Sequence, residues 1–105
     1  MFYYTYVLFS LKDKKFYSGF STDLDHRMHK HNKGDTPSTK YRRPLLLIFY
    51  EAYLNKRDAL RREKYFKTAK GKTTLRTMLT EYLRELEKEK NKIVEFRNKK
   101  KKLLI

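Results

Sequence analysis

The sequence predicts a small α/β sandwich in which a three-stranded, mainly antiparallel sheet is flanked by three helices. Residues 2–11 and 16–21 are aromatic and β-branched runs separated by a polar cluster, which is a hairpin signature. Residues 45–54 form a continuous apolar run, typical of a central strand that is covered on both faces. Apolar residues recur at helical spacing in three further segments: residues 22–33, 56–68 and 72–97.

The predicted hairpin places tyrosines on neighbouring strands. Tyr4 and Tyr6 lie two residues apart, so their side chains point to the same face of the first strand. Tyr17 begins the second strand, and Gly19 follows it. Because glycine has no side chain, we expect another backbone or a phosphate to approach closely at Gly19.

The first predicted helix carries an arginine and a histidine on one face. Thr22, with Asp25 three residues later, is an N-terminal capping signal. Arg27 and His31 are four residues apart, so they lie one above the other and can hold a single anionic group. Gly34 follows the expected end of this helix.

Residues 33–43 are rich in turn-forming residues and end in three cations around a tyrosine. These are Lys40, Arg42 and Arg43, with Tyr41 between them. We interpret the segment as a mobile loop that faces the substrate. A solvated connection between the first helix and the next strand is the alternative interpretation.

The second predicted helix places a carboxylate among its apolar residues. The apolar stripe consists of three residues: Ala59, Leu60 and Phe66. Glu63 falls on this stripe, and an unpaired carboxylate there would cost several kcal/mol of desolvation. We therefore expect a cation, a metal ion or strong hydrogen-bond donors beside Glu63. The alternative is a boundary carboxylate in a surface ion pair with Lys67, four residues later.

The third predicted helix begins after Gly71, which breaks the helical pattern, and Thr73 or Thr74 caps it. Its apolar residues share one face, which we expect to pack on the sheet: Leu75, Met78, Leu79, Tyr82, Leu83 and Leu86. This division gives a domain of residues 1–87 and a basic helical extension of residues 88–105. The extension is either a solvated appendage or a non-specific contact for phosphates.

Composition points to a polyanionic partner. The 27 Lys and Arg residues against 12 Asp and Glu residues give a formal net charge of +15, and nucleic acid is the expected partner. No run approaches the roughly 18 apolar residues of a membrane span, and no signal peptide is evident, so we expect a cytoplasmic protein that does not bind membranes. The absence of cysteine excludes disulfides and thiolate metal sites.

Together these residues resemble the GIY-YIG nuclease superfamily. Its two triplets are matched by Tyr4-Thr5-Tyr6 and Tyr17-Ser18-Gly19, although Tyr4, Thr5 and Ser18 replace the usual residues. Arg27 and His31 follow in the expected order. Within the superfamily, the small single-domain bacterial proteins of the UPF0213 type are the nearest likeness, through residues 41–44 (YRRP) and 59–64 (ALRREK).

The resemblance implies a metal-dependent endonuclease that cleaves DNA in repair, recombination or defence. Glu63 would hold one Mg²⁺ or Mn²⁺ ion, and Arg27 would clamp the scissile phosphate. Tyr6 and Tyr17 would orient or activate the attacking water, one of them as a general base whose phenol pKa nearby cations lower. His31 would assist as a proton carrier or a phosphate donor.

The nucleic-acid-binding residues expected from the basic segments are Lys40, Tyr41, Arg42, Arg43 and Lys67. Two other functions stay open at this point. One is a catalytically silent, basic nucleic-acid-binding protein, and the other is a basic structural protein that docks on RNA or ribosomes. DNA is the expected substrate, whereas its form, the sequence specificity and the oligomeric state are open.

Overall fold

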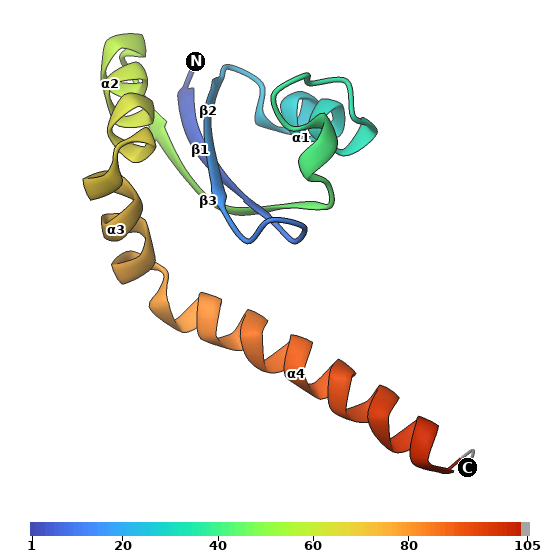
Figure 1. Cartoon of the computed structure of the whole chain (residues 1–105). Helices are drawn as coiled ribbons and strands as arrows, with labels where there is room; N and C mark the ends of the chain where they lie inside the picture. The colour runs from blue at the N-terminus through green and yellow to red at the C-terminus, as the bar shows by residue number, and fades with distance from the viewer. Residues whose placement is uncertain (104–105) are drawn as a thin grey trace. The chain divides into compact units, whose positions relative to one another are not determined.

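The structure, a computed structural model, describes the backbone of residues 1–103 and the side chains of residues 1–91. Figure 1 shows the elements in order: β1 (Tyr3–Ser10), β2 (Phe16–Ser21), α1 (Leu24–Lys33), the short 3-10 helix η1 (Lys40–Arg42), β3 (Leu45–Tyr53), α2 (Lys56–Lys67), α3 (Ala69–Met78) and α4 (Thr80–Leu103). The predicted α/β class with a three-stranded antiparallel sheet is confirmed. Within the described backbone, residues 1–103, four α-helices are present where three were predicted.

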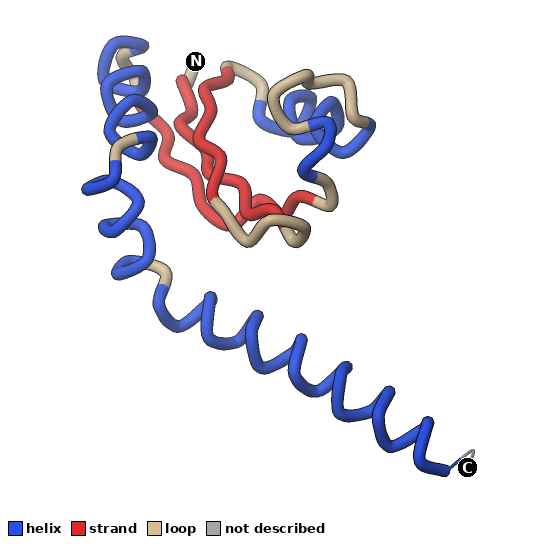
Figure 2. Tube along the Cα trace, viewed as in Figure 1, coloured by secondary structure: helices blue, strands red, loops and turns tan. Residues whose placement is uncertain are grey.

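β1 is the central strand of the sheet, whose order is β2-β1-β3, with both pairings antiparallel (Figure 2). The prediction that residues 45–54 form the central strand is wrong. β3 lies at an edge, and its apolar run includes side chains that stay exposed, among them Leu47 and Tyr50. β1 is instead buried on both faces although it contains polar residues, because those residues find hydrogen-bond partners in other elements.

The two faces of the sheet are covered by different helices, α1 on one side and α2 on the other (Figures 1 and 2). Thr5 and Tyr6 are neighbours on β1, so their side chains point to opposite faces. Thr5 Oγ1 donates to the Ala59 carbonyl oxygen of α2 at 2.6 Å, whereas Tyr6 contacts His31 of α1. The α1 face is a core of buried side chains with partly buried ones packed against it: Tyr6, Leu8, Leu45, Tyr17, Leu24 and Met28.

α1 begins one residue later than the capping signal indicated. Asp23 is the N-cap, because its Oδ1 accepts from the His26 backbone N–H at 3.1 Å, so the assignment to Thr22 is wrong. Asp23 carries a carboxylate, which also suits the positive end of the helix dipole. The expected C-terminal stop is confirmed, since Gly34 adopts a left-handed conformation with φ of 82°.

α2 begins after Asn55, whose side chain caps it by accepting from the Arg57 backbone N–H. α2 and α3 follow each other with a single residue between them, which the sequence did not indicate. Thr68 Oγ1 accepts from the Gly71 N–H at 3.0 Å and so caps α3, whereas capping by Thr73 or Thr74 was expected. Gly71 lies inside α3, so the expectation that it breaks the helical pattern is wrong. The position requires glycine because a Cβ there would be 1.9 Å from the Tyr65 carbonyl oxygen.

The single helix predicted over residues 72–97 is wrong, because α3 and α4 are separated at residue 79. Thr80 Oγ1 donates to the Arg76 carbonyl oxygen at 2.7 Å and to the Thr77 carbonyl oxygen at 3.0 Å. Such back-bonding by threonine competes with the backbone ladder and bends helices. That the apolar face of this segment packs on the sheet stays a prediction.

The side chains of residues 92–105, including the lysine-rich end of the basic extension, lie outside the described residues. Among the helices that the structure describes, none combines the length and the apolar character needed to cross a bilayer.

Candidate active site

Tyr6 reaches its position because residue 19 has no side chain. The sheet register pairs Tyr6 with Gly19 on β2. A Cβ atom at position 19 would lie 2.3 Å from both Cζ and the hydroxyl oxygen of Tyr6. Gly19 therefore accommodates the Tyr6 ring, and not the backbone or phosphate that the sequence suggested.

A buried chain of hydrogen bonds begins at Tyr6. The Tyr6 hydroxyl oxygen lies 2.8 Å from Nε2 of His31, and the two rings meet edge to face. The second ring nitrogen of His31, Nδ1, lies 2.7 Å from Oγ1 of Thr39. All three side chains are at most 2% exposed. The chain thus connects the central strand through α1 to the residue that precedes η1.

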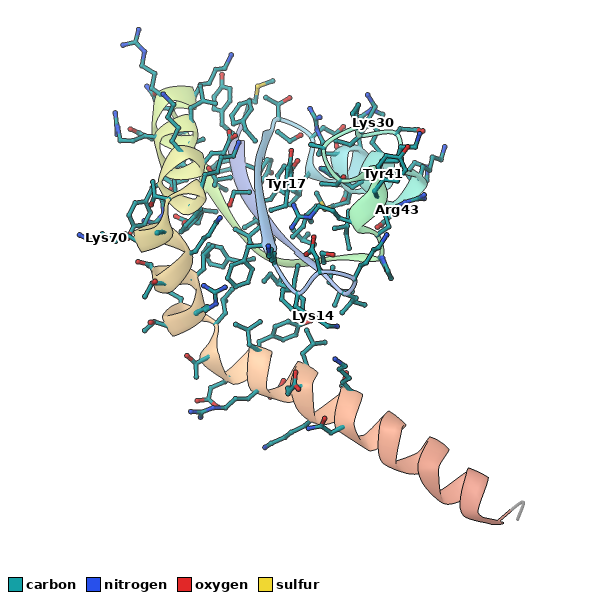
Figure 3. The ribbon with its side chains drawn as sticks, in the orientation of Figure 1. Lys14, Tyr17, Lys30, Tyr41, Arg43 and Lys70 are labelled. Carbon is teal, nitrogen blue, oxygen red and sulfur yellow. The ribbon has the colours of Figure 1, made fainter. Side chains whose placement is uncertain are left out.

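Tyr17 stands beside this chain and is closer to solvent. Its ring meets the His31 ring edge to face, with 5.5 Å between centroids. Its hydroxyl oxygen accepts from Oγ of Ser38, an exposed residue of the loop, at 3.0 Å. Figure 3 labels Tyr17 on β2, and Tyr41 and Arg43 of the loop beside α1. Tyr6 and Tyr17 therefore lie on the same face of the sheet, where both rings contact His31.

Electrostatic interactions place three more predicted residues around the Tyr6 phenol. Burial raises the pKa of Tyr6 above its ordinary value, Tyr17 and Glu63 raise it further, and Arg27 opposes them. The expectation that cations lower the phenol pKa is therefore wrong for Tyr6, because desolvation outweighs the charge of Arg27. Burial, with Arg27 second, lowers the pKa of His31. The imidazole is consequently neutral at pH 7.

Arg27 is a half-buried cation without a paired carboxylate. Within the part of the chain that the structure describes, its guanidinium makes no ion pair. Its charge still acts on both Tyr6 and His31, so Arg27 lies near the buried hydrogen bonds that join Tyr6, His31 and Thr39. A guanidinium held there is free to bind an anion by two parallel hydrogen bonds.

Glu63 reaches the site from α2. Its side chain is 17% exposed, and its Oε1 lies 2.8 Å from Nζ of Lys67. The cation expected beside Glu63 is thus Lys67, as the surface-pair alternative described. A hollow of about 180 Å³ lined by Tyr17 and Lys67 lies between β2 and α2. Leu60, assigned to the same stripe, is 38% exposed, so that assignment is wrong.

Two of the loop cations are engaged within the fold. Arg42 Nε donates to Asp13 at 2.6 Å, and its Nη2 donates to the Phe16 carbonyl oxygen at 3.3 Å. The guanidinium holds the pKa of the Asp13 carboxyl below its ordinary value. Arg43 donates to the carbonyl oxygen of Asn32 at the end of α1. These contacts anchor the loop that was expected to be mobile.

Lys40 and Tyr41 are exposed residues of the same loop. The Lys40 Nζ lies 5.3 Å from the centre of the Tyr41 ring, and Tyr41 is 74% exposed. Such an exposed aromatic beside a cation suits contact with a base and a phosphate. Of the residues expected to bind nucleic acid, these two keep their functional groups outward, whereas Lys67 is paired with Glu63.

Sequence reasoning missed Ser38 and Thr39. Each supplies a hydroxyl to the tyrosine and histidine cluster, yet both lie in a turn-rich segment without helical or strand periodicity. Their contacts with Tyr17 and His31 join residues 21 and 8 positions apart. No local pattern could indicate them.

The candidate site contains one carboxylate. No group of three or more His, Asp or Glu side chains that could hold a metal ion occurs among the described residues. Glu63, shielded yet near the Tyr6 phenol, can supply one oxygen ligand, and water or a phosphate would have to complete the coordination. The arrangement otherwise offers a free guanidinium, a neutral imidazole and two phenols.

Comparison with known proteins agrees with the resemblance in the sequence. Residues 2–78 match the family described as the GIY-YIG catalytic domain. UPF0213 protein YazA of Bacillus subtilis (strain 168) is 46% identical over 57 residues, which are 53% of this chain and 58% of YazA. UPF0213 protein SH2523 of Staphylococcus haemolyticus is 37% identical over 67 residues, 63% of this chain and 80% of that protein.

A similar solved structure is the solution NMR structure of UPF0213 protein BH0048 from Bacillus halodurans. Its sequence is 33% identical, the match covers 74% of this chain and 85% of BH0048, and the TM-score is 0.48.

Proposed function

Because this chain belongs to the nuclease-type GIY-YIG family and, within it, to the UPF0213 proteins, we propose that it is a divalent-metal-dependent endonuclease that hydrolyses phosphodiester bonds in DNA. One observation carries the proposal. A buried Tyr6–His31 hydrogen bond lies where the charges of Arg27 and Glu63 both act on the phenol. A protein that only binds nucleic acid needs cations on its surface but no such buried group.

The site residues fit phosphodiester hydrolysis in distinct ways. Arg27, which has no ion-pair partner among the described residues, clamps the scissile phosphate and offsets the charge that develops on it. The raised pKa keeps Tyr6 protonated, so its hydroxyl acts as a hydrogen-bonding group. Tyr17, nearer to solvent, is the tyrosine that we assign to orient the attacking water. His31 stays neutral and positions Tyr6.

Glu63 is the residue that would hold Mg²⁺ or Mn²⁺. A single carboxylate with water and substrate phosphate is a common way to bind Mg²⁺, so the donor set fits one ion. When bound, the ion supplies charge neutralisation at the phosphate. Lys67 now occupies one Glu63 oxygen, so it has to turn away, which its 52% exposed side chain permits.

DNA is the partner that we propose from the net charge of +15 and from Lys40 and Tyr41. Residues 1–87 would form the nuclease domain, and residues 88–105 would contact phosphates outside the site. A role in repair, recombination or defence follows from the proposed chemistry, and the cytoplasm is the proposed location.

A second candidate is a basic nucleic-acid-binding protein without catalysis. The Glu63–Lys67 ion pair favours it, because a glutamate neutralised by lysine has no need of a metal ion. In that case Arg27 would hold a phosphate without cleaving it.

The purified chain tests both candidates on linear duplex, branched and single-stranded DNA, with Mg²⁺, Mn²⁺ or EDTA. We expect cleavage that requires the metal ion and binding that weakens steeply as salt increases. Binding without cleavage under every condition would contradict the nuclease and support the silent binder. RNA of the same sequences is the control for substrate type.

A further inference from the structure

Ser18 has a buried position but an unused hydroxyl. It lies beside Tyr17 on β2, an edge strand of the sheet, and is 4% exposed. Its hydroxyl makes no hydrogen bond to another described residue. No fully enclosed side-chain oxygen of the described residues lacks a partner, so the small exposed part of Ser18 must include this hydroxyl. A hydroxyl that is held in place without a partner is available to a ligand.

The hydroxyl faces the hollow of about 180 Å³ between β2 and α2, because Ser18 lines that hollow. The lining carries two cations, two hydroxyl groups and no carboxylate, which suits an anion. Its volume is below the roughly 300–1,000 Å³ of pockets that enclose drug-sized ligands, so the hollow suits one small group. The lining residues are Phe16, Tyr17, Ser18, Phe66, Lys67 and Lys72.

Lys72 reaches the hollow because α3 begins directly after α2. Its backbone N–H donates to the Thr68 carbonyl oxygen at 3.0 Å, which holds Lys72 in the first turn of α3. Gly71 lets this turn approach α2 closely, since a Cβ there would clash with the Tyr65 carbonyl oxygen. Lys72 makes no ion pair among the described residues, so its ammonium group is available to an anion.

The hollow borders the candidate active site. Tyr17 belongs to both, since its ring contacts His31 and it also lines the hollow. Lys67 lines the hollow too, while its Nζ lies 2.8 Å from Oε1 of Glu63. When Lys67 turns away from Glu63, the hollow is therefore beside it. An anion in the hollow would lie next to a phosphate that is held at Glu63.

We propose that Ser18, Lys67 and Lys72 form a second phosphate site, which holds the phosphodiester group adjacent to the scissile one in the bound DNA strand. The phosphate oxygens accept hydrogen bonds from the Ser18 hydroxyl and from the two ammonium groups. The phosphate site itself rests on the hollow and its lining. Its place beside the scissile phosphate rests on the proposed function.

The site is tested first without DNA, by ¹H–¹⁵N correlation NMR of the full chain at pH 7 with inorganic phosphate. Sodium chloride of equal ionic strength is the control. We expect saturable shifts of the backbone amide signals of Ser18 and Lys72. Ser18→Ala removes only the hydroxyl oxygen and should weaken phosphate binding about tenfold. Shifts that do not saturate, that chloride also produces, or that Ser18→Ala leaves unchanged would overturn the site.

DNA binding then tests whether the site is used. Fluorescence anisotropy of a labelled duplex in EDTA measures affinity without cleavage, and a salt series gives the slope of log affinity against log salt concentration. Lys72→Met removes one phosphate contact, so we expect weaker binding and a slope that is shallower by about one. Lys72→Arg keeps the charge and should keep the slope.

Lys64→Met is the matched control, because Lys64 is an exposed lysine of α2 that does not line the hollow. It should change the affinity by less than about twofold. An equal loss in Lys64→Met and Lys72→Met would overturn the site, since overall charge would then explain both.

Neutral methylphosphonate linkages locate the site along the strand. With one linkage replaced at a time, the wild type should lose most affinity, apart from the cleaved linkage, at the linkage adjacent to it. Lys72→Met should lose nothing further at that adjacent linkage. An equal loss at every linkage, or the same loss in Lys72→Met as in the wild type, would overturn the placement.

The outcomes separate this inference from the proposed function. A wild type that cleaves no DNA, but whose Ser18→Ala and Lys72→Met variants bind phosphate and DNA more weakly, contradicts the nuclease and the placement and leaves the phosphate site standing. An active wild type whose two variants bind phosphate and DNA as tightly as the wild type supports the nuclease and overturns the second phosphate site.

Discussion

The two faces of the sheet bury similar polar side chains but pair their charges differently. On the α2 face, Glu51 accepts from Arg62 Nε at 2.8 Å and from the Tyr53 hydroxyl, so the carboxylate is satisfied by two donors. On the α1 face, Arg27 has no carboxylate partner among the described residues, and His31 is kept neutral. Removing one partner of a paired, partly buried charge destabilises a fold, whereas an unpaired charge is available to a ligand.

The two faces meet at β1, whose consecutive residues point to opposite sides of the sheet. Thr5 and Tyr6 are consecutive, yet Thr5 bonds a backbone carbonyl of α2 and Tyr6 bonds a side chain of α1. Position along β1 therefore decides whether a buried hydroxyl serves the fold or the candidate site. Glu63 is intermediate, because it is paired with Lys67 and also acts on Tyr6.

Glu63→Gln should cause the largest change. The variant keeps the shape of the side chain but loses the charge that would hold the metal ion, so we expect cleavage to fall by at least roughly 100-fold. Folding and DNA binding in low salt should persist. Glu81→Gln, at a glutamate that is 83% exposed on α4, is the control. Cleavage by Glu63→Gln at the wild-type rate would make Glu63 structural.

Arg27→Ala should reduce cleavage on a similar scale, about 100-fold, by removing the phosphate clamp. Because Arg27 has no ion-pair partner among the described residues, its loss should change the free energy of unfolding by no more than about 0.5 kcal/mol. Urea unfolding and single-turnover cleavage measure the two quantities. Arg84→Ala, at an exposed arginine of α4, is the control. A large loss of stability with unchanged cleavage would show that Arg27 stabilises the fold and does not act in cleavage.

Arg62→Ala should show the reverse pattern. It leaves Glu51 without its cation in a partly buried position, so we expect a loss of about 1–3 kcal/mol in the free energy of unfolding. Cleavage per folded molecule should stay unchanged, because Arg62 lies on the other face of the sheet. Arg61→Ala, whose side chain is 76% exposed, is the control for stability. An equal loss of stability in Arg62→Ala and Arg61→Ala would contradict the structural role assigned to the Arg62–Glu51 pair.

His31 should make the free energy of unfolding depend on pH, because burial lowers its pKa in the native state. The native pKa of His31 lies below its ordinary value of 6.5, so just below pH 6.5 the unfolded chain binds a proton at His31 and the native state does not. The contribution of His31 to stability is therefore fully present above pH 6.5, and it is lost as the pH falls from 6.5 through the native pKa. Urea unfolding between pH 5 and about 7.5 measures the slope. If His31→Gln showed the same dependence of stability on pH, another group would be responsible. Asp13 is not a candidate, because its lowered pKa places its titration below this pH range.

Much of the α1 face could be predicted from the sequence because its signals are local. Two-residue alternation placed Tyr4 and Tyr6 on one face of β1, the hairpin placed Tyr17 on the neighbouring strand, and four-residue spacing put Arg27 and His31 on one helix face. The strand order could not be predicted in this way. An apolar run such as β3 looks like a central strand, while β1 is central because Thr5 and Ser10 find partners far along the chain.

The remaining parts of the site depend on contacts between distant segments. Arg42 was expected to face nucleic acid but bonds Asp13 instead, 29 positions away. Thr39 has no periodic signal, and its place depends on that anchored loop. The direction of the Tyr6 pKa shift also depends on burial, which the residue type alone does not reveal.

The hairpin tip is where protein engineers usually insert tags or fluorescent domains, since exposed turns tolerate added residues. In this chain the tip is unsuitable for insertion. Ser10 Oγ accepts from the Lys12 and Asp13 N–H groups and donates to the Arg42 carbonyl oxygen, while Asp13 binds the Arg42 guanidinium. Residues added there would displace η1 and, with it, Thr39. Reporter groups are better inserted elsewhere, at a position whose backbone holds no other segment in place.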